Sequence, residues 1–253
     1  MRKKNCSSSP FLTSGKFYQR IYYRIPDINS FSNLQKLEVL DLSYTMLSGS
    51  VSQVLGGLTS IMSLNISNNF FTGGLLEIDA YPNLDVLNIS DASNALQILD
   101  LSMNHFSGGL IVEGLTNCST ILRQLHVDFN LLFGHLPNAL YLMSSLEQLS
   151  ISFNNFSGQL SKRLSKLFRL KILVVFGNRF SGPLPDVFGN LRELEQFSAH
   201  SNNFLGLLPS SLLFCPMLQV LDLRNNSLTG NISPNFTRMP NLTSLIISQV
   251  LLY

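Results

Sequence analysis

Few side chains in this sequence are placed where they could carry out chemistry. His126 and Asp128 stand two residues apart, so they would share one face of a strand, but no recognisable motif places a Ser or Cys nucleophile beside them. The patterns H-E-x-x-H, G-x-G-x-x-G and the Walker loop do not occur. The three cysteines, Cys6, Cys118 and Cys215, lack the spacing of metal ligands. The sequence therefore indicates a protein that is not an enzyme and that has no metal or cofactor.

The composition indicates a folded chain without a polyanionic partner. Of the 253 residues, 45% are hydrophobic and 13% are charged, which argues against disorder. The formal net charge of +2 is too small to favour nucleic acid. No apolar run reaches the roughly 18 residues of a membrane span, and residues 1–30 lack the continuous apolar segment of a signal peptide. We therefore expect an N-terminal tail at residues 1–30, with no clear signal peptide, and no membrane insertion by this segment.

A repeat of about 24 residues organises residues 31–253. Counted from the first Leu or Ile of each L-x-x-L-x-L unit, successive units are separated by 24, 23, 12 and 26 residues and then five times by 24. Most units carry an Asn eight residues after this start and a Gly twelve residues after it. The pattern is typical of leucine-rich repeats. It predicts an α/β horseshoe solenoid with a parallel concave sheet and an irregular or 3-10 convex side. The units start at Leu37, Ile61, Leu84, Leu96, Leu122, Leu146, Leu170, Leu194, Leu218 and Leu242.

Each position of the repeat has a physical role. Leu146, Leu149 and Ile151 should point into a core shared by stacked coils, because one coil cannot bury its own apolar face. The amide of Asn154 should bond backbone groups at the bend, since an unpaired buried amide costs free energy. Gly at the twelfth step suits a backbone with positive φ.

The period is broken between Leu84 and Leu96. Only six residues, 90–95, separate the end of one strand pattern from the start of the next, whereas a parallel connection needs about a dozen. We therefore predict a local disruption near residues 84–101, with one strand displaced or a return path missing. The pattern also stops in the middle of a coil after Leu242, so we expect a repeat domain that is truncated at its C-terminus.

The unit L-x-x-L-x-L-x-x-N-x-F-x-G-x-L-P, as in residues 170–185, resembles the plant extracellular type of leucine-rich repeat. This type occurs in receptor-like kinases, receptor-like proteins and inhibitors of cell-wall hydrolases. More narrowly, Pro185-Asp186-Val187-Phe188, Asn202-Asn203-Phe204 and the run from Leu221 to Gly230 are similar to phytosulfokine receptor ectodomains. The resemblance covers about residues 31–248.

This resemblance implies a segment at the extracellular face of the plasma membrane that binds a short, tyrosine-sulfated peptide hormone and recruits a co-receptor kinase. The family's Ser/Thr kinase motifs are absent from this chain. Two alternatives stay open. The chain could be a stand-alone interaction protein resembling the hydrolase inhibitors or receptor-like proteins, or a truncated product without function.

The candidate ligand-binding residues lie on the concave strands. Ile172, Val174 and Phe176 place three apolar side chains on a face that is polar in the neighbouring coils, and such patches often mark recognition sites. A simpler interpretation is that they pack against a neighbouring coil or a missing segment. The resemblance implies that Arg224 contacts the anionic peptide, with Asp222 as a competing ion-pair partner. His200 lies on the same face, between these groups.

Nine N-x-S/T sequons predict a glycoprotein. Glycans on Asn65 and Asn88 would obstruct the early concave strands, which leaves the coils from Leu122 to Arg224 as the contact zone. The sequons begin at Asn5, Asn65, Asn88, Asn117, Asn155, Asn225, Asn231, Asn235 and Asn241.

Overall fold

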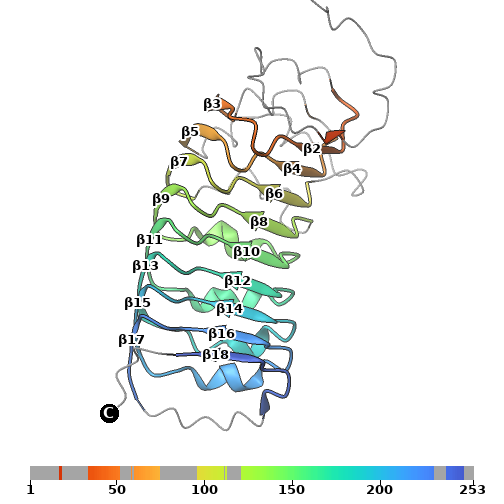
Figure 1. The fold of residues 1–253 in the computed structure, drawn as a ribbon. Coiled ribbons are helices and arrows are strands. Elements are labelled where there is room, and N and C mark those ends of the chain that lie inside the picture. Colours follow the sequence, from red (N-terminus) through yellow and green to blue (C-terminus); the bar gives the residue numbers. More distant parts are fainter. Residues whose placement is uncertain are drawn as a thin grey trace, which may run out of the picture.

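The computed structural model is an elongated stack of coils (Figure 1). It describes residues 17–18, 34–51, 58, 60–74, 96–110, 112, 121–230 and 238–247. Each coil contributes a short strand to a concave sheet, turns, and returns along the opposite side. This arrangement confirms the leucine-rich repeat solenoid.

The concave sheet has ten parallel strands among the described residues. Equivalent positions pair across coils: Leu149 lies opposite Leu173, which lies opposite Phe197, so the 24-residue period is also the register. The strands, in spatial order, are β1 (Phe17–Tyr18), β2 (Val39–Asp41), β4 (Ser63–Asn65), β6 (Ile98–Asp100), β8 (Gln124–His126), β10 (Gln148–Ser150), β12 (Ile172–Val174), β14 (Gln196–Ser198), β16 (Val220–Asp222) and β18 (Ser244–Ile246).

The predicted fault lies between β4 and β6. These two strands pair directly, with Ser63 opposite Ile98, so no strand lies between them. The predicted unit that starts at Leu84 falls on residues 75–95, which lie outside the described part of the chain. One strand of the sheet was missed by the repeat pattern, because β1 lies within the predicted tail and pairs with β2.

A second parallel sheet follows the asparagine turns and was not predicted. The repeat pattern predicts an irregular or 3-10 return path, but the segment that carries the glycine, such as Phe180 to Gly182, forms short paired strands in eight of the described coils. Its glycines have positive φ, as at Gly134 (88°) and Gly182 (74°). The strands are β3 (Ser48–Ser50), β5 (Phe70–Gly74), β7 (His105–Gly108), β9 (Leu131–Gly134), β11 (Asn155–Gly158), β13 (Arg179–Pro183), β15 (Asn203–Gly206) and β17 (Ser227–Leu228).

The convex side carries short 3-10 helices, as predicted. Pro137 and Pro209 directly precede two of them, where a fixed φ suits the start of a helical turn. The helices are η4 (Asn138–Leu142), η5 (Lys162–Lys166), η6 (Phe188–Asn190) and η7 (Ser210–Phe214). None of the helices in the described ranges is long and apolar enough to cross a bilayer.

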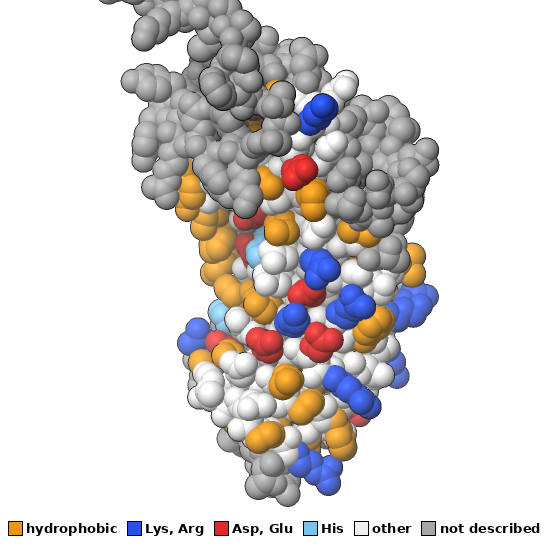
Figure 2. All heavy atoms as spheres, turned by 90° about the vertical axis from the view of Figure 1, so that its right-hand side faces the viewer, with side chains coloured by type: hydrophobic (Ala, Val, Ile, Leu, Met, Phe, Trp, Pro, Cys, Tyr) orange, Lys and Arg blue, Asp and Glu red, His pale blue; other side chains and the backbone are white. Residues whose placement is uncertain are grey.

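The core runs through the whole stack. Leu146, Leu149 and Ile151 are at most 1% exposed. The rings of Phe156 and Phe180 lie one above the other with centroids 6.3 Å apart. Most charged side chains lie outside this core: Figure 2 shows basic and acidic groups lying side by side on one flank of the stack. The repeat therefore provides a rigid frame that positions the exposed side chains of each coil.

Candidate ligand-binding site on the concave sheet

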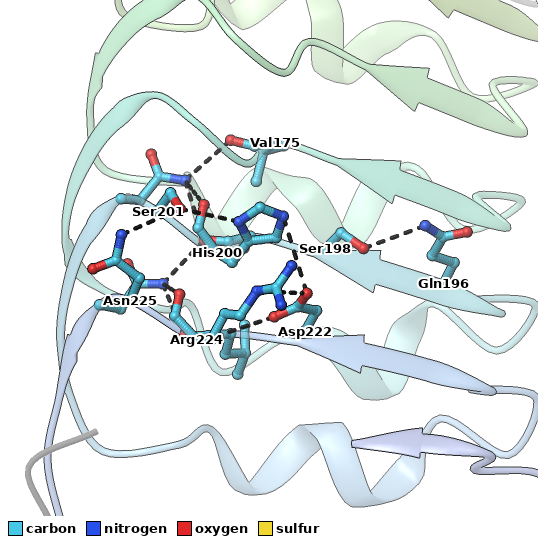
Figure 3. Close-up of polar contacts among 12 residues, drawn as sticks. Val175, Gln196, Ser198, His200, Ser201, Asp222, Arg224 and Asn225 are labelled. Carbon is cyan, nitrogen blue, oxygen red and sulfur yellow. Dashed lines mark hydrogen bonds and ion pairs between the residues drawn. The ribbon is translucent and has the colours of Figure 1, made fainter. Parts of the chain in front are cut away.

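The six predicted binding residues lie on three neighbouring coils. Ile172 and Val174 belong to β12, and Phe176 follows it; His200 follows β14; Asp222 ends β16, and Arg224 follows it. Val174, Ser198 and Asp222 pair in register, so the residues two positions later also become neighbours. Figure 3 shows His200, Asp222 and Arg224 close together in this part of the sheet.

Ring stacking links Phe176 to the next coil. Its centroid lies 4.2 Å from that of His200, with the planes 14° apart. On the other side, Phe153 meets Phe176 edge-on at 5.1 Å and stacks on Phe129 at 4.3 Å. These four residues, Phe129, Phe153, Phe176 and His200, form an aromatic ladder across four coils. Offset and edge-on contacts of this kind stabilise neighbouring aromatic rings.

The apolar trio is less exposed than predicted. Ile172, Val174 and Phe176 are half-buried, because each packs between the concave side chains of adjacent coils. The simpler interpretation is therefore partly right. Phe129 and Phe153, which the sequence analysis missed, are instead 44% and 46% exposed. They occupy the turn position just before the asparagine, and this shared position was the only signal that could have identified them.

Asp222 lies at the centre of the polar part of the site. Its Oδ1 accepts the backbone N–H of Arg224 at 3.2 Å, and its Oδ2 lies 3.4 Å from Arg224 Nε and 4.0 Å from His200 Nε2. The Asp222 side chain is 9% exposed, whereas that of Arg224 is 49% exposed. Arg224 and Asp222 thus form the predicted ion pair, but only Nε of the guanidinium takes part in it. Within the described residues, the two Nη groups make no hydrogen bond.

His200 is held between these groups. Burial lowers the pKa of its imidazole; the Asp222 carboxylate opposes this effect, and Arg224 adds to it. Its Nδ1 lies 3.1 Å from Ser201 Oγ, which also accepts a hydrogen bond from Asn225 Nδ2 at 3.2 Å. A neutral imidazole beside an exposed guanidinium leaves the positive charge of the site on Arg224.

His126 and Asp128 do not form a catalytic pair. Asp128 is buried and its Oδ1 accepts the Ser152 N–H and the Ser150 hydroxyl, both at 2.7 Å, so the carboxylate joins two coils. His126 Nε2 is buried without a hydrogen-bond partner. No group of three or more His, Cys, Asp or Glu residues in the described ranges could hold a metal ion.

Four predicted glycosylation sites lie in the described part of the chain. Asn65 is half-buried on concave strand β4, and Asn155 is half-buried at the start of β11. Asn225 and Asn241 are exposed. The sequons at Asn5, Asn88, Asn117, Asn231 and Asn235 lie outside the described residues.

Comparisons with known proteins agree with the repeat. The sequence profile of the Leucine Rich Repeat family matches residues 36–58, 95–118, 145–167, 169–191 and 217–239. Receptor-like protein 36 of Arabidopsis thaliana is 34% identical over 116 residues, which cover 46% of this chain and 14% of that protein. The calmodulin-binding receptor kinase CaMRLK of the same plant is 36% identical over 93 residues, covering 37% of this chain and 13% of the kinase. The chain spans less than a fifth of these relatives.

Solved structures of plant receptors share the fold. The peptide hormone receptor RGFR1, in complex with RGF2, has a TM-score of 0.77 and 30% identity over 88% of this chain and 34% of its own. The Arabidopsis receptor kinase HAESA, in complex with the peptide hormone IDA and the co-receptor SERK1, has a TM-score of 0.65 and 28% identity over 87% of this chain and 39% of its own.

The fold is a leucine-rich repeat solenoid, and five of its segments match the Leucine Rich Repeat family. More particularly, the chain is similar to the leucine-rich repeat ectodomains of plant receptor-like proteins and receptor kinases.

Proposed function

We propose that this chain is a ligand-binding segment of a plant receptor at the extracellular face of the plasma membrane. Its ligand is a short peptide with an anionic group, bound along the concave surface from β12 to β16. The complex is completed by a co-receptor kinase. Solved relatives support this class of ligand and partner, because RGFR1 and HAESA are described with peptide hormones, and HAESA also with a co-receptor.

The proposal rests on the arrangement of the Arg224 guanidinium. Asp222 contacts its Nε, so the guanidinium is oriented while both Nη groups stay available. A guanidinium in this arrangement suits a sulfate or a carboxylate through paired hydrogen bonds. The aromatic ladder beside it offers an apolar surface for the neighbouring side chains of a peptide. The charge of Arg224 and the apolar area of the ladder thus lie on five adjoining coils.

The earlier coils explain why the contact zone begins at β12. In three of them, a carboxylate or amide oxygen accepts the backbone N–H two residues later, as in Asp41 with Ser43, Asn65 with Ser67, and Asp100 with Ser102. Asp128 likewise accepts from Ser150 and Ser152. These polar groups already have partners within the sheet. Asp222 accepts the Arg224 N–H in the same way, but in the coils of β12, β14 and β16 the position of these serines is held by Phe176, His200 and Arg224. Of these three side chains, Arg224 offers a charged donor.

The finer form of the proposal concerns the anion. Similarity to phytosulfokine receptors favours a sulfated tyrosine, whose ring would lie against the aromatic ladder while its sulfate meets Arg224. A peptide C-terminal carboxylate is also an anion that a guanidinium binds, so it is the alternative to the sulfated tyrosine.

Calorimetric titration tests both forms. The probes are synthetic phytosulfokine, its unsulfated form, and short peptide libraries with a free or an amidated C-terminus. Arg224→Ala should weaken binding of the sulfated or free-acid probe by about tenfold to a hundredfold, and Arg224→Lys by less. Arg179→Ala, at an exposed arginine on β13, is the matched control and should change nothing. Unaltered binding in Arg224→Ala, or in Val174→Asp, would remove the proposal.

A further inference from the structure

Eight exposed apolar side chains form a continuous strip where the concave sheet turns into the second sheet. We call it the apolar strip. Its members are between 43% and 65% exposed. Phe168 and Met217 are also exposed but lie on the convex side, after η5 and η7, and exposed Leu205 and Leu207 lie at β15, further along the second sheet. The apolar strip comprises Tyr44, Met46, Phe70, Met103, Phe129, Leu131, Phe133 and Phe153.

The strip has a hollow at one end and projecting rings at the other. A hollow of about 700 Å³ lies over the first three described coils, between Tyr44, Met46, Phe70, Met103 and His105. This volume is typical of pockets that accept apolar groups. At the other end, Phe129 stacks on Phe153, while Leu131 and Phe133 project from β9 beside them. The backbone N–H of Met103 donates to the carbonyl of Asp128, so the two ends are adjoining coils of one surface.

The fold alone does not account for these residues. Phe129 and Phe153 have φ angles of 52° and 49°, a region that bulky side chains rarely adopt. Asn68 and Asn225 occupy the equivalent position in other coils, at φ 55° and 51°, and Asn tolerates this region well. A phenylalanine there adds backbone strain and places half of its ring in water. Large apolar patches of this kind mark interaction sites.

We propose that the apolar strip is the interface of a homodimer, in which a second copy packs in antiparallel orientation. A two-fold axis at the middle of the strip places the projecting rings of each copy over the hollow of its partner. Such an isologous contact makes the same pairing twice. The inference rests on area, charge and spacing and not on the proposed function, although Phe129 and Phe153 belong to both the apolar strip and the aromatic ladder.

The area is sufficient for a stable dimer. Residues of this size present on the order of 200 Å² when free, so eight side chains near half exposure offer about 800 Å² per copy. Two such surfaces together bury about 1,600 Å², the usual size of a specific interface. The projecting phenylalanines would act as anchors in the hollow of the partner.

Charge and spacing also favour a second copy. The eight strip residues include no Lys, Arg, Asp or Glu, so bringing two identical strips together places no like charges opposite each other. The side chains are spaced by the coil repeat, about 4.8 Å along the stack. A second copy presents the same spacing, and rows with equal spacing can interdigitate along their full length.

Sedimentation of the full chain tests this directly. Asn155 begins a sequon and lies opposite Phe133 of the strip in the pairing of β9 with β11. The protein is therefore made without N-glycans, so that a glycan on Asn155 does not cover the strip. Over about 0.1 to 100 µM we expect a species of twice the chain mass of 28.2 kDa. Phe129→Asn with Phe133→Asn should raise the dimer Kd at least about tenfold. Phe168→Asn is the matched control, with the same change at 51% exposure on the convex side, and should leave it unchanged.

Cross-linking tests the orientation. When F70C chains are mixed with F133C chains and oxidised, a covalent heterodimer should form, because an axis at the middle of the strip, at β7, brings β5 of one copy opposite β9 of the other. Wild-type protein under the same oxidation gives the background from Cys6, Cys118 and Cys215. Circular dichroism verifies that each variant is folded. A wild-type chain that stays monomeric at every concentration would assign the strip to some other molecule and overturn the proposal. A dimer that is unchanged in the double variant, or that yields no F70C–F133C product above the wild-type background, would overturn it equally.

Discussion

Removing the amide of Asn154 should destabilise the solenoid by an amount that the hydrogen bonds allow us to estimate. The side chain is buried, at 7% exposure. Its Oδ1 accepts the backbone N–H of Leu132 at 3.0 Å, in the preceding coil. Its Nδ2 donates to the carbonyls of Val127, Ile151 and Ser152 at 2.9, 3.3 and 3.1 Å. The amide therefore joins two coils at their bend.

Asn154→Ala affects the three carbonyl acceptors and the Leu132 N–H donor differently. Each of the three carbonyls keeps a second partner: Asn130 Nδ2, Asn178 Nδ2 and the Phe129 N–H, respectively. The Leu132 N–H loses its side-chain acceptor inside the core, which costs about 1–3 kcal/mol. The lost Nδ2 bonds add roughly 1 kcal/mol, so we expect a total of about 2–4 kcal/mol. This is a large part of the roughly 5–15 kcal/mol that stabilises a folded domain.

Urea unfolding followed by circular dichroism measures this loss. With a slope near 3 kcal/mol per M, the midpoint of Asn154→Ala should fall by about 1 M. Hydrogen exchange should show protection lost first in the coils containing β9 and β11, because repeat proteins lose contacts locally. Asn203→Ala is the matched control at an exposed asparagine and should shift stability by no more than about 0.5 kcal/mol. Equal midpoints for the two variants would refute the reasoning.

Three further changes probe other parts of the fold. Burial raises the pKa of the Cys215 thiol from 9.0 to about 12, so a maleimide at pH 8 should label Cys215 only on unfolding. Prompt labelling of Cys215 in the native protein, located by peptide mass spectrometry and distinguished from Cys6 and Cys118, would contradict this. The hydrogen bond from Lys171, with Arg123 also nearby, lowers the pKa of Glu147. The stability that the ionised Glu147 carboxylate contributes is therefore present above pH 4.5, its usual pKa. It is lost as the pH falls through the lower pKa that Glu147 has in the folded state. Glu147→Gln should cost about 0.2–1 kcal/mol at pH 7 in thermal melts and nothing in acid; a deficit that persisted in acid would assign the effect to packing. Gly134 has φ of 88° and open space around it. Gly134→Ala should therefore reduce the free energy of unfolding by about 1–2 kcal/mol through backbone strain alone. A neutral result in urea unfolding would show that the turn relaxes.

The concave sheet could be predicted because its signal repeats. Leu149, Leu173 and Leu221 each supply the central buried side chain of a strand, and the 24-residue period fixes their register. The second sheet could not be predicted in this way. Its strands carry one buried residue, such as Phe156, next to a glycine of positive φ, and this pattern also suits an irregular turn. Strand β1 lies before the first repeat and has no periodic signal.

The candidate site could be predicted in position but not in detail. The period brings Val174, His200 and Arg224 to adjoining coils, so their proximity follows from the sequence. The contacts of Asp222 depend on side-chain conformations, which no repeat specifies. The stacking of Phe129 on Phe153 also depends on the backbone turn at positive φ, which directs both rings outward. A sequence pattern identifies which positions face solvent, but the geometry between coils decides what those side chains do.

The two proposed surfaces share Phe129 and Phe153, but each also has residues of its own, so the proposals can be separated. The Phe153 ring contacts Phe176 of the candidate site and stacks on Phe129 of the apolar strip. A change at Phe153 should therefore affect both peptide binding and dimerisation, whereas Phe133 makes no ring contact with the ladder and lies only in the strip. If Phe133→Asn weakens the dimer and leaves peptide binding intact while Arg224→Ala does the reverse, the two surfaces act independently. If both variants impair both activities, Phe153 transmits the state of one surface to the other, because dimer contacts at its exposed edge would fix the ring that packs on Phe176.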